Sequence, residues 1–416
     1  MTRSRFEATG RLALLGALLF TFMAASSAPT PLYARYQQAW GFSTFWLTWV
    51  FAVYAFALLA ALLVGGRLSD HLGRRVVILA AVGMEAGALV LFHQAHGLVD
   101  LILARALQGW ATGIATSALG AALLDSDPRR GPWLNSLAPL LGMTAGALGC
   151  GLLVTFAPAP LQRVYQVFFG VFLLLGLGLS RWPDVLPPRP GLLAALRPQL
   201  AVPPQARAML WRVLPVELAV WAISGFYLSL MPGLIKTATG TTSVLVGGAV
   251  VAGLTLSGAA CLHGLRHWPC ERLLRLGSGA LCAGPGVLWL AVAGGHLSLF
   301  VLGTLITGIG FGSGFLGATR SLFPLAEPDQ RAGLLAAFYA LSYLAFCVPV
   351  LLVSAIVSWL GLAGAAQLYL AGIMLLALLG GWTLTTPHLP VMPEAARRRL
   401  AAGLPTARRF RTVRGH

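Results

Sequence analysis

Long apolar runs alternate with short polar segments along nearly the whole chain. A membrane-spanning helix needs about 20 mostly apolar residues, and twelve runs meet that requirement. Six of them lie in the first part of the chain: Leu12–Ala28, Phe45–Val64, Val76–Phe92, Leu98–Leu124, Trp133–Phe156 and Val164–Arg181. Six more follow a proline-rich segment: Val213–Gly233, Val244–Leu262, Leu273–Ala293, Leu297–Ala318, Leu334–Val357 and Ala363–Leu384. The pattern predicts an all-α integral membrane protein.

This spacing divides the chain into four parts. Residues 1–182 and 213–386 would each form a bundle of six helices, and residues 183–212, which hold seven prolines, would form a cytoplasmic linker. Residues 387–416 would form a basic cytoplasmic tail. The first run also looks like a signal peptide, but we interpret it as an uncleaved first span because the loop charges need its orientation.

Composition favours the bilayer as solvent. The chain is 57% hydrophobic and 10% charged, whereas a soluble protein carries about 25% charged residues. Its net charge of +17 would fit a nucleic-acid-binding protein, but the position of the charges argues against that function. With the N-terminus inside, 25 of the 29 Lys and Arg residues fall in cytoplasmic segments and three fall outside. The positive-inside rule therefore predicts cytoplasmic termini and a basic face against anionic lipid.

One polar loop between the second and third runs carries a regular motif. It reads GRLSDHLGRR over residues 66–75 and resembles the signature loop of the major facilitator superfamily. The matching positions are Gly66, Leu68, Asp70, Gly73, Arg74 and Arg75. Ser69 and His71 replace the usual alanine and arginine. The resemblance implies two pseudo-symmetric six-helix bundles and a loop that acts as a conformational latch. A plain basic loop that fixes topology is the alternative.

The two halves also repeat each other. Gly109 and Gly113 in the fourth run correspond roughly to Gly308 and Gly312 in the tenth. The segment 264–275 occupies the place of a second signature loop but lacks the aspartate. Repeated six-span halves are typical of transporters that work by alternating access.

The fourth run contains the arginine Arg105, and a bare charge inside the membrane is costly. With Gln108 and Gly109 it resembles the family's second motif, Arg-x-x-Gln-Gly, which implies a buried arginine that faces the central cavity and helps to couple protons to substrate. A structural arginine bonded to backbone carbonyls is the alternative. Glu85, in the third run, is either a proton carrier or a protonated structural carboxyl group.

Other candidates for the cavity lie in later runs. Glu217 begins the seventh run, with Trp221 one turn on and Tyr227 on nearly the same face. An acidic group among aromatic rings suits a cationic or aromatic ligand, although a surface ion pair between Glu217 and Arg212 fits equally well. The remaining polar candidates are Asn135, Tyr339 and Tyr343, for which helix packing is the alternative role.

The fifth run carries part of the family's antiporter motif. Gly142, Gly146 and Gly151 match it, whereas Ala147 replaces its proline and Cys150 one of its glycines. Small residues at this spacing equally serve helix packing.

No cofactor or metal site is predicted. The five cysteines show no disulfide or metal-ligand spacing, and the chain lacks the Gly-Lys-Ser/Thr of a P-loop, so an ion gradient is the expected energy source. We therefore expect a monomeric secondary transporter in the bacterial inner membrane, which exports a small molecule in exchange for protons, and not an enzyme. The alternatives are proton-coupled or facilitated uptake, a membrane solute receptor, or a lipid-modifying enzyme.

Overall fold

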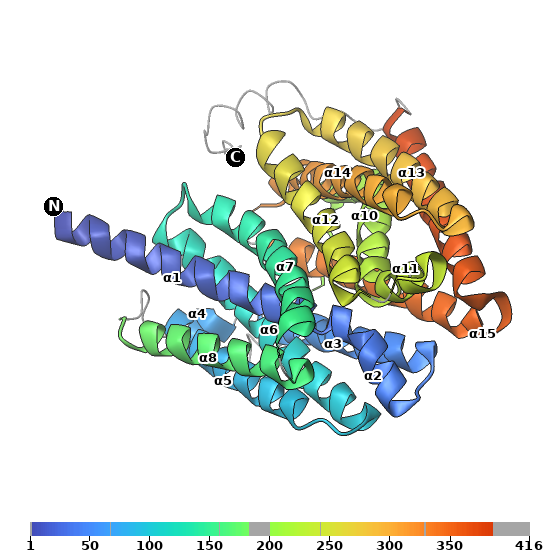
Figure 1. Cartoon of the computed structure of the whole chain (residues 1–416). Coiled ribbons are helices and arrows are strands. Elements are labelled where there is room, and N and C mark those ends of the chain that lie inside the picture. The colour runs from blue at the N-terminus through green and yellow to red at the C-terminus, as the bar shows by residue number, and fades with distance from the viewer. Residues whose placement is uncertain are drawn as a thin grey trace, which may run out of the picture. The chain divides into compact units, whose positions relative to one another are not determined.

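The computed structural model describes residues 2–66, 68–157, 159–182, 200–241, 243–327 and 330–385. These residues form helices and connecting turns, without strands (Figure 1). The helices of the first half are α1 (Thr2–Ser27), α2 (Tyr33–Trp40), α3 (Thr44–Gly65), α4 (Leu68–Leu72), α5 (Arg74–His93), α6 (Leu98–Ser126), α7 (Gly131–Phe156) and α8 (Pro160–Ser180). Those of the second half are α10 (Pro204–Ser229), α11 (Met231–Thr239), α12 (Val244–Gly264), α13 (Cys270–Gly294), α14 (Leu297–Leu322) and α15 (Arg331–Thr385). Short 3-10 turns, η1 (Thr30–Leu32) and η2 (Phe323–Leu325), join neighbouring helices.

Eleven of the described helices are long and apolar enough to cross a membrane, and the last of them is long enough for two crossings. Helix α15 has 55 residues, which would extend about 80 Å if straight, far more than the hydrocarbon thickness of about 30 Å. Gly361 interrupts it with a φ of 69° and a ψ of 166°. The described residues thus contain twelve spans, as the hydropathy pattern predicts.

The predicted linker overlaps the first helix of the second half. Helix α10 begins at Pro204, so residues 204–212 of the predicted 183–212 linker are helical. Residues 183–199, together with the predicted tail at 387–416, lie outside the described residues. The described residues up to Leu384 belong to one compact unit, and Thr385 belongs to a second unit that runs to His416.

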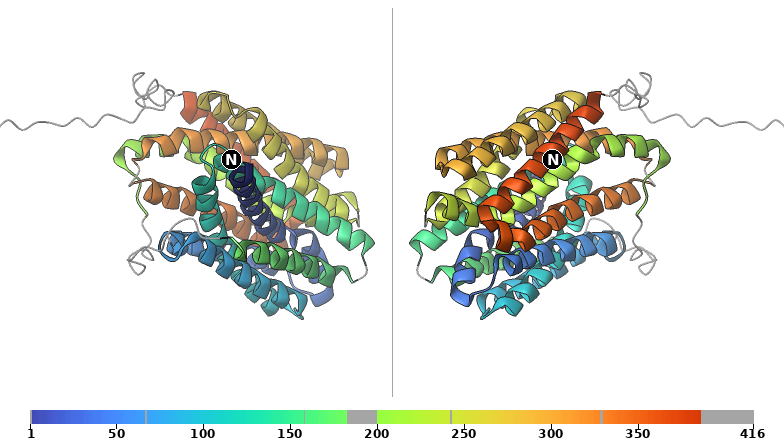
Figure 2. Two further views of the ribbon diagram at one scale, coloured as in Figure 1. Left: turned by 90° about the vertical axis from the view of Figure 1, so that its left-hand side faces the viewer. Right: turned by 90° about the vertical axis from the view of Figure 1, so that its right-hand side faces the viewer.

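The packing of the two halves follows a common plan. Helix α6 packs closely against α3 and α5, and α14 packs closely against α12 and α13. The glycines that correspond in sequence have corresponding places: a Cβ at Gly109 or Gly113 would meet backbone of α3, and one at Gly308 or Gly312 would meet backbone of α12. Figure 2 shows the grouping of the earlier, blue-to-green helices and the later, yellow-to-red ones. The predicted repeat is therefore present in three dimensions.

Helices α7 and α12 join the halves along most of their length (Figure 1). Near their middle, the hydroxyl groups of Thr144 and Thr255 lie 2.8 Å apart. Closer to the C-terminal end of α12, the indole Nε1 of Trp133 donates to Nδ1 of His263 at 3.2 Å. Small residues allow this approach, since a Cβ at Gly248 would meet the carbonyl oxygen of Ala147.

The turn between α6 and α7 is held by an aspartate. The carboxylate of Asp127 accepts hydrogen bonds from the backbone N–H groups of Arg129 at 2.8 Å and Arg130 at 3.0 Å. The N–H groups of Arg130 and Arg129 lower the pKa of Asp127 below its usual value, because they stabilise the charged form. Asp127 therefore stabilises the turn that precedes α7.

Candidate functional site

The guanidinium group of Arg105 is buried between α6 and the end of α1. Arg105 is 1% exposed, and its NH1 donates to the backbone oxygen of Ser26 at 3.1 Å. Its Cζ lies 4.5 Å from the ring centroid of Tyr54 and 5.7 Å from that of Tyr33. The two aromatic faces and the carbonyl oxygen offset the hydration that the charged guanidinium group loses on burial. Its Nε has no hydrogen-bond partner among the described residues.

Gln108 connects Arg105 to a buried glutamate. Its Oε1 accepts from Arg105 NH1 at 2.6 Å, and its Nε2 donates to Glu85 Oε1 at 2.9 Å. The same Nε2 also lies 3.2 Å from the backbone oxygen of Ala25. Glu85 is fully buried, and its Oε2 has no hydrogen-bond partner among the described residues. Arg105, Gln108 and Glu85, which we call the polar chain, thus link α1, α5 and α6.

Gly109 brings the polar chain and its aromatic cover together. A Cβ at this position would meet the backbone oxygen of Tyr54 and the Cβ of Ala57. The absence of a side chain therefore lets α3 approach α6 closely enough for the Tyr54 ring to cover Arg105.

A second buried carboxyl group lies in the other half. Glu217 in α10 is 1% exposed. Its Oε1 accepts from Trp221 Nε1 at 2.6 Å and from Ser342 Oγ at 3.1 Å, whereas its Oε2 has no hydrogen-bond partner in the described part of the chain. The ion pair with Arg212 that the sequence left open is absent among the described residues; Arg212 instead donates to the backbone oxygens of Thr383 and Leu384.

Aromatic rings surround Trp221. Its nearest ring neighbour is Tyr343, at 4.9 Å between centroids, followed by Phe346 at 5.9 Å, Tyr339 at 6.3 Å and Phe315 at 6.5 Å. Helices α10, α14 and α15 supply these five rings, which we call the ring cluster. Two of the sequence candidates, Tyr339 and Tyr343, thus lie beside Trp221.

The ring cluster touches the first half of the chain. Phe346 packs against Phe51 of α3 with 4.8 Å between centroids. Phe51 lies three residues before Tyr54, so the two share a face of α3. A single helical turn therefore separates the contact with the ring cluster from the ring that covers Arg105.

Two other candidates lie away from both clusters. The hydroxyl of Tyr227 donates to Thr304 Oγ1 at 2.8 Å, which ties α10 to α14. The Oδ1 of Asn135 in α7 would lie 3.1 Å from a Cβ added at Gly120 in α6. Asn135 therefore packs against α6.

The signature loop forms a compact set of contacts within the first half. Arg74 pairs with Asp70 at 2.5 Å and with Asp125, near the end of α6, at 3.1 Å. Its NH1 also donates to Ser69 Oγ at 2.5 Å. Ser117 of α6 donates to the backbone oxygen of Gly66 at 2.8 Å.

Two further motif residues fix the start of α5. Gly73 precedes the helix with a φ of 93°, a conformation that glycine adopts without strain. Arg75 donates from NH2 to the last carbonyl of α8, that of Ser180, at 2.6 Å. Leu68 begins the short helix α4.

The glycines of the partial antiporter motif lie at helix contacts. A Cβ at Gly142 would meet the carbonyl oxygen of Phe20, and one at Gly146 would meet that of Ala24, both in α1. A Cβ at Gly151 would lie 3.1 Å from Cα of Leu245 in α12. Ala147 and Cys150, which depart from the motif, are both buried.

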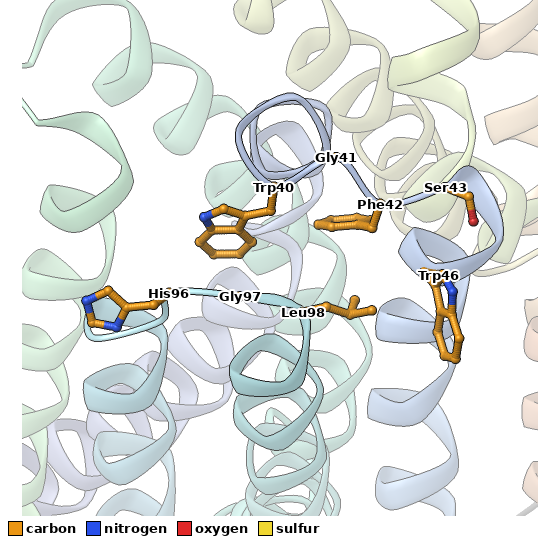
Figure 3. Close-up of a pocket in the computed structure, with 8 residues that line it drawn as sticks. All are labelled: Trp40, Gly41, Phe42, Ser43, Trp46, His96, Gly97 and Leu98. Carbon is orange, nitrogen blue, oxygen red and sulfur yellow. The ribbon is translucent and has the colours of Figure 1, made fainter.

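An open hollow of about 710 Å³ lies at the start of α6, away from the polar chain. It is formed by the segment between α2 and α3 and the segment between α5 and α6 (Figure 3). Its lining residues are Trp40, Gly41, Phe42, Ser43, Trp46, His96, Gly97 and Leu98. Arg105 lies seven residues after Leu98, about 10 Å further along the helix.

Neither the sequence nor its motifs singled out Tyr54, Tyr33, Ser342 or Asp125. Their roles depend on which face of α2, α3, α6 or α15 meets a neighbour. The three long helices among these are apolar on most sides and carry no such signal. The four cysteines that lie in apolar runs, and Cys270, are all free.

The long apolar helices and the polar groups buried between them define a multi-pass helical membrane protein. The family model of the Major Facilitator Superfamily matches residues 14–295. The chain belongs to this superfamily.

Known proteins resemble the chain to different extents. It is 28% identical to the multidrug resistance protein MdtL of Klebsiella pneumoniae (strain 342) over 148 residues. This matched region covers 34% of this chain and 37% of that protein. The chain therefore matches little more than a third of the length of this relative.

Two solved structures share the fold. The human organic anion transporter MFSD10 (TETRAN) superposes with a TM-score of 0.65 at 17% identity, over 91% of this chain and 99% of that one. A variant of the nucleoside transporter NupG superposes with a TM-score of 0.69 at 12% identity, over 90% of this chain and 98% of that one.

Proposed function

We propose that the protein exports a small molecule across the bacterial inner membrane in exchange for protons. The observation that carries this proposal is the polar chain, in which a buried carboxyl group is linked to a buried guanidinium group. Ionisable groups inside a membrane are costly and mark ion pathways or proton relays. The termini and the signature loop would lie in the cytoplasm, as the charge distribution favours, and the protein would act as a monomer.

Glu85 would carry the proton. Its Oε2 has no partner in the described part of the chain, so this oxygen can take up or release a proton without breaking a hydrogen bond. In the ionised state, Glu85 attracts Arg105 through Gln108, whose two ends bond to the two groups. Protonation removes that attraction, so the contacts between α5, α6 and α1 weaken. Proton binding would thereby favour one of the two conformations of alternating access.

The signature loop would act as the latch at the cytoplasmic side. Arg74 holds Asp70 and Asp125 together, which keeps the loop fixed to the end of α6. A rigid loop can lock against the other half in one state and release it in the other.

Export is favoured by the relative whose name describes multidrug resistance. Inverted membrane vesicles test the direction directly. Deleting the gene and screening compound arrays for altered sensitivity would supply candidate substrates. With such a compound outside inverted vesicles, an acidic interior should drive its accumulation at least tenfold above that in vesicles lacking the protein. Accumulation that ignores the pH gradient would contradict proton exchange.

Uptake is the second candidate function. It is favoured by the departures from the antiporter motif at Ala147 and Cys150. Under this alternative, right-side-out vesicles with an acidic exterior would concentrate the compound, and inverted vesicles with an acidic interior would not.

A further inference from the structure

Glu217 lies among groups that leave its charge uncompensated. None of the ion pairs between described residues includes it, and its two partners, Trp221 and Ser342, are neutral donors. Both donate to Oε1, so Oε2 is the free position. In its ionised form, a carboxylate in such a place is stabilised by a neighbouring cation, which offsets the cost of burial.

The rings beside Glu217 suit a cation with an apolar body. Trp221 has an edge-on or tilted geometry to each of its four ring neighbours, with interplanar angles from 55° to 86°. The cluster therefore presents ring faces in several directions, and ring faces attract cations. Glu217 is fully covered, whereas Trp221, Tyr339, Tyr343 and Phe315 are partly exposed. A ligand would meet the rings first and the carboxylate behind them.

Arg105, in the other half, does not offer an accessible site for an anionic ligand. Arg105 is 1% exposed and lies under the rings of Tyr54 and Tyr33. An anionic ligand would have to displace both rings to reach its guanidinium group. The partly exposed groups of this site are thus aromatic rings, and the carboxylate bonded to one of them is that of the buried Glu217.

We infer that Glu217 and the ring cluster form a binding site for organic cations with aromatic or bulky apolar bodies. The site joins α10 and α15 through the Glu217–Ser342 hydrogen bond and reaches α3 through Phe346. The ring cluster contacts the first half through Phe346 and Phe51, so cation binding at the cluster depends on how the halves are placed. This inference rests on the proposed transport function and names the substrate class for it.

Equilibrium binding to the purified full-length protein in nanodiscs tests the inference without any ion gradient. The probe is radiolabelled tetraphenylphosphonium, with tetraphenylborate as an anion of the same shape. The wild type should bind tetraphenylphosphonium saturably, and unlabelled tetraphenylphosphonium should displace it at a concentration at least tenfold lower than tetraphenylborate does. Equal displacement by the anion, or no saturable binding, would overturn the inference.

Variants separate the carboxylate from the rings. Glu217→Gln should weaken tetraphenylphosphonium binding at least tenfold, because the amide has nearly the same shape but no charge. Glu271→Gln removes an exposed carboxylate that is 59% accessible and paired with Arg275, and it should change binding less than twofold. Unchanged binding in Glu217→Gln would contradict the site.

A second pair of variants covers the case in which Glu217→Gln fails to fold, as judged by size-exclusion profile. Tyr343→Leu should weaken binding at least fivefold, whereas Tyr343→Phe, which keeps the ring, should change it less than twofold. Equal binding by both would overturn the role of the rings. Because no gradient is used, saturable binding without proton-driven flux would count against the proposed export and leave the site intact.

Discussion

At the scale of single residues, Gln108 is the member of the polar chain with the most side-chain hydrogen bonds. Its amide satisfies Arg105 at one end and Glu85 and the Ala25 carbonyl at the other. An amide presents an acceptor and a donor side by side, which is what a guanidinium group and a carboxylate require from a common neighbour. The Arg-x-x-Gln-Gly spacing indicated Arg105 and Gln108, but the sequence alone gave no reason to pair them with Glu85 of α5.

Replacing Gln108 with alanine should break this link. It leaves a donor of Arg105 and an acceptor of Glu85 without their partner, and each unsatisfied buried group costs about 1–3 kcal/mol. We expect proton-driven transport to fall more than tenfold and thermal stability in detergent to decrease. Gln38→Ala, at an exposed position in α2, is the control and should change neither. Full activity of Gln108→Ala in vesicles would contradict the coupling role.

The signature loop offers a second prediction at this scale. Asp70→Asn removes one of the two carboxylates that Arg74 holds, and Arg74 is only 8% exposed. We expect transport to be lost while the protein is still made and inserted, measured by flux and by immunoblotting of membranes. Glu271→Gln is the control. It breaks an i,i+4 ion pair in which both side chains are exposed, and because such pairs contribute little to stability, flux should stay normal. Normal flux in Asp70→Asn would count against the latch.

At the scale of elements, the hydropathy pattern predicted the spans well because apolar length is the main requirement of a bilayer. The predicted fifth span, Trp133–Phe156, ends at the same residue as α7, Gly131–Phe156. The start of α10 was missed because its prolines suggested a linker, whereas Pro204 lies at the first helical position, where proline is favoured. Tyr54 was missed because packing, not propensity, decides which face of α3 meets α6.

The break in α15 is the element-scale feature most open to test. Gly361 has a φ of 69° and a ψ of 166°, a conformation essentially restricted to glycine, in which an added Cβ costs roughly 1–3 kcal/mol. Gly361→Ala should therefore lower the melting temperature of the purified protein. Gly372→Ala lies in the following helical stretch with nothing within 4 Å of an added Cβ, and it should leave the melting temperature equal or slightly higher. A Gly361→Ala protein as stable as the wild type would contradict the strained turn.

At the scale of the whole molecule, the repeat explains the architecture. Each half packs glycines of its fourth span against its second span. Gly109 and Gly113 of α6 lie against α3, and Gly308 and Gly312 of α14 lie against α12. The loops differ between the halves. In the first half, Arg74 of the loop reaches Asp125 of α6, and in the second, Arg320 of α14 donates to the backbone oxygens of Arg266 and Trp268 in the loop. A reversed arrangement of donor and acceptor thus anchors the loop of each half.

Twelve spans with a basic inner face also make a topology prediction. Reporter fusions after residues 71 and 267 should indicate a cytoplasmic position, and fusions after residues 96 and 240 an external one. The excess of Lys and Arg in the first set of loops is the physical reason. An external reporter signal at residue 71 would contradict the orientation on which the latch and the direction of transport depend.

The central claim is that proton exchange at Glu85 powers transport, and flux through purified protein in liposomes tests it most directly. With a compound identified by the sensitivity screen, the wild type should concentrate the compound when a pH gradient is imposed. Glu85→Gln should still exchange labelled for unlabelled compound but should not concentrate it. Gradient-driven accumulation by Glu85→Gln at the wild-type level would contradict the account.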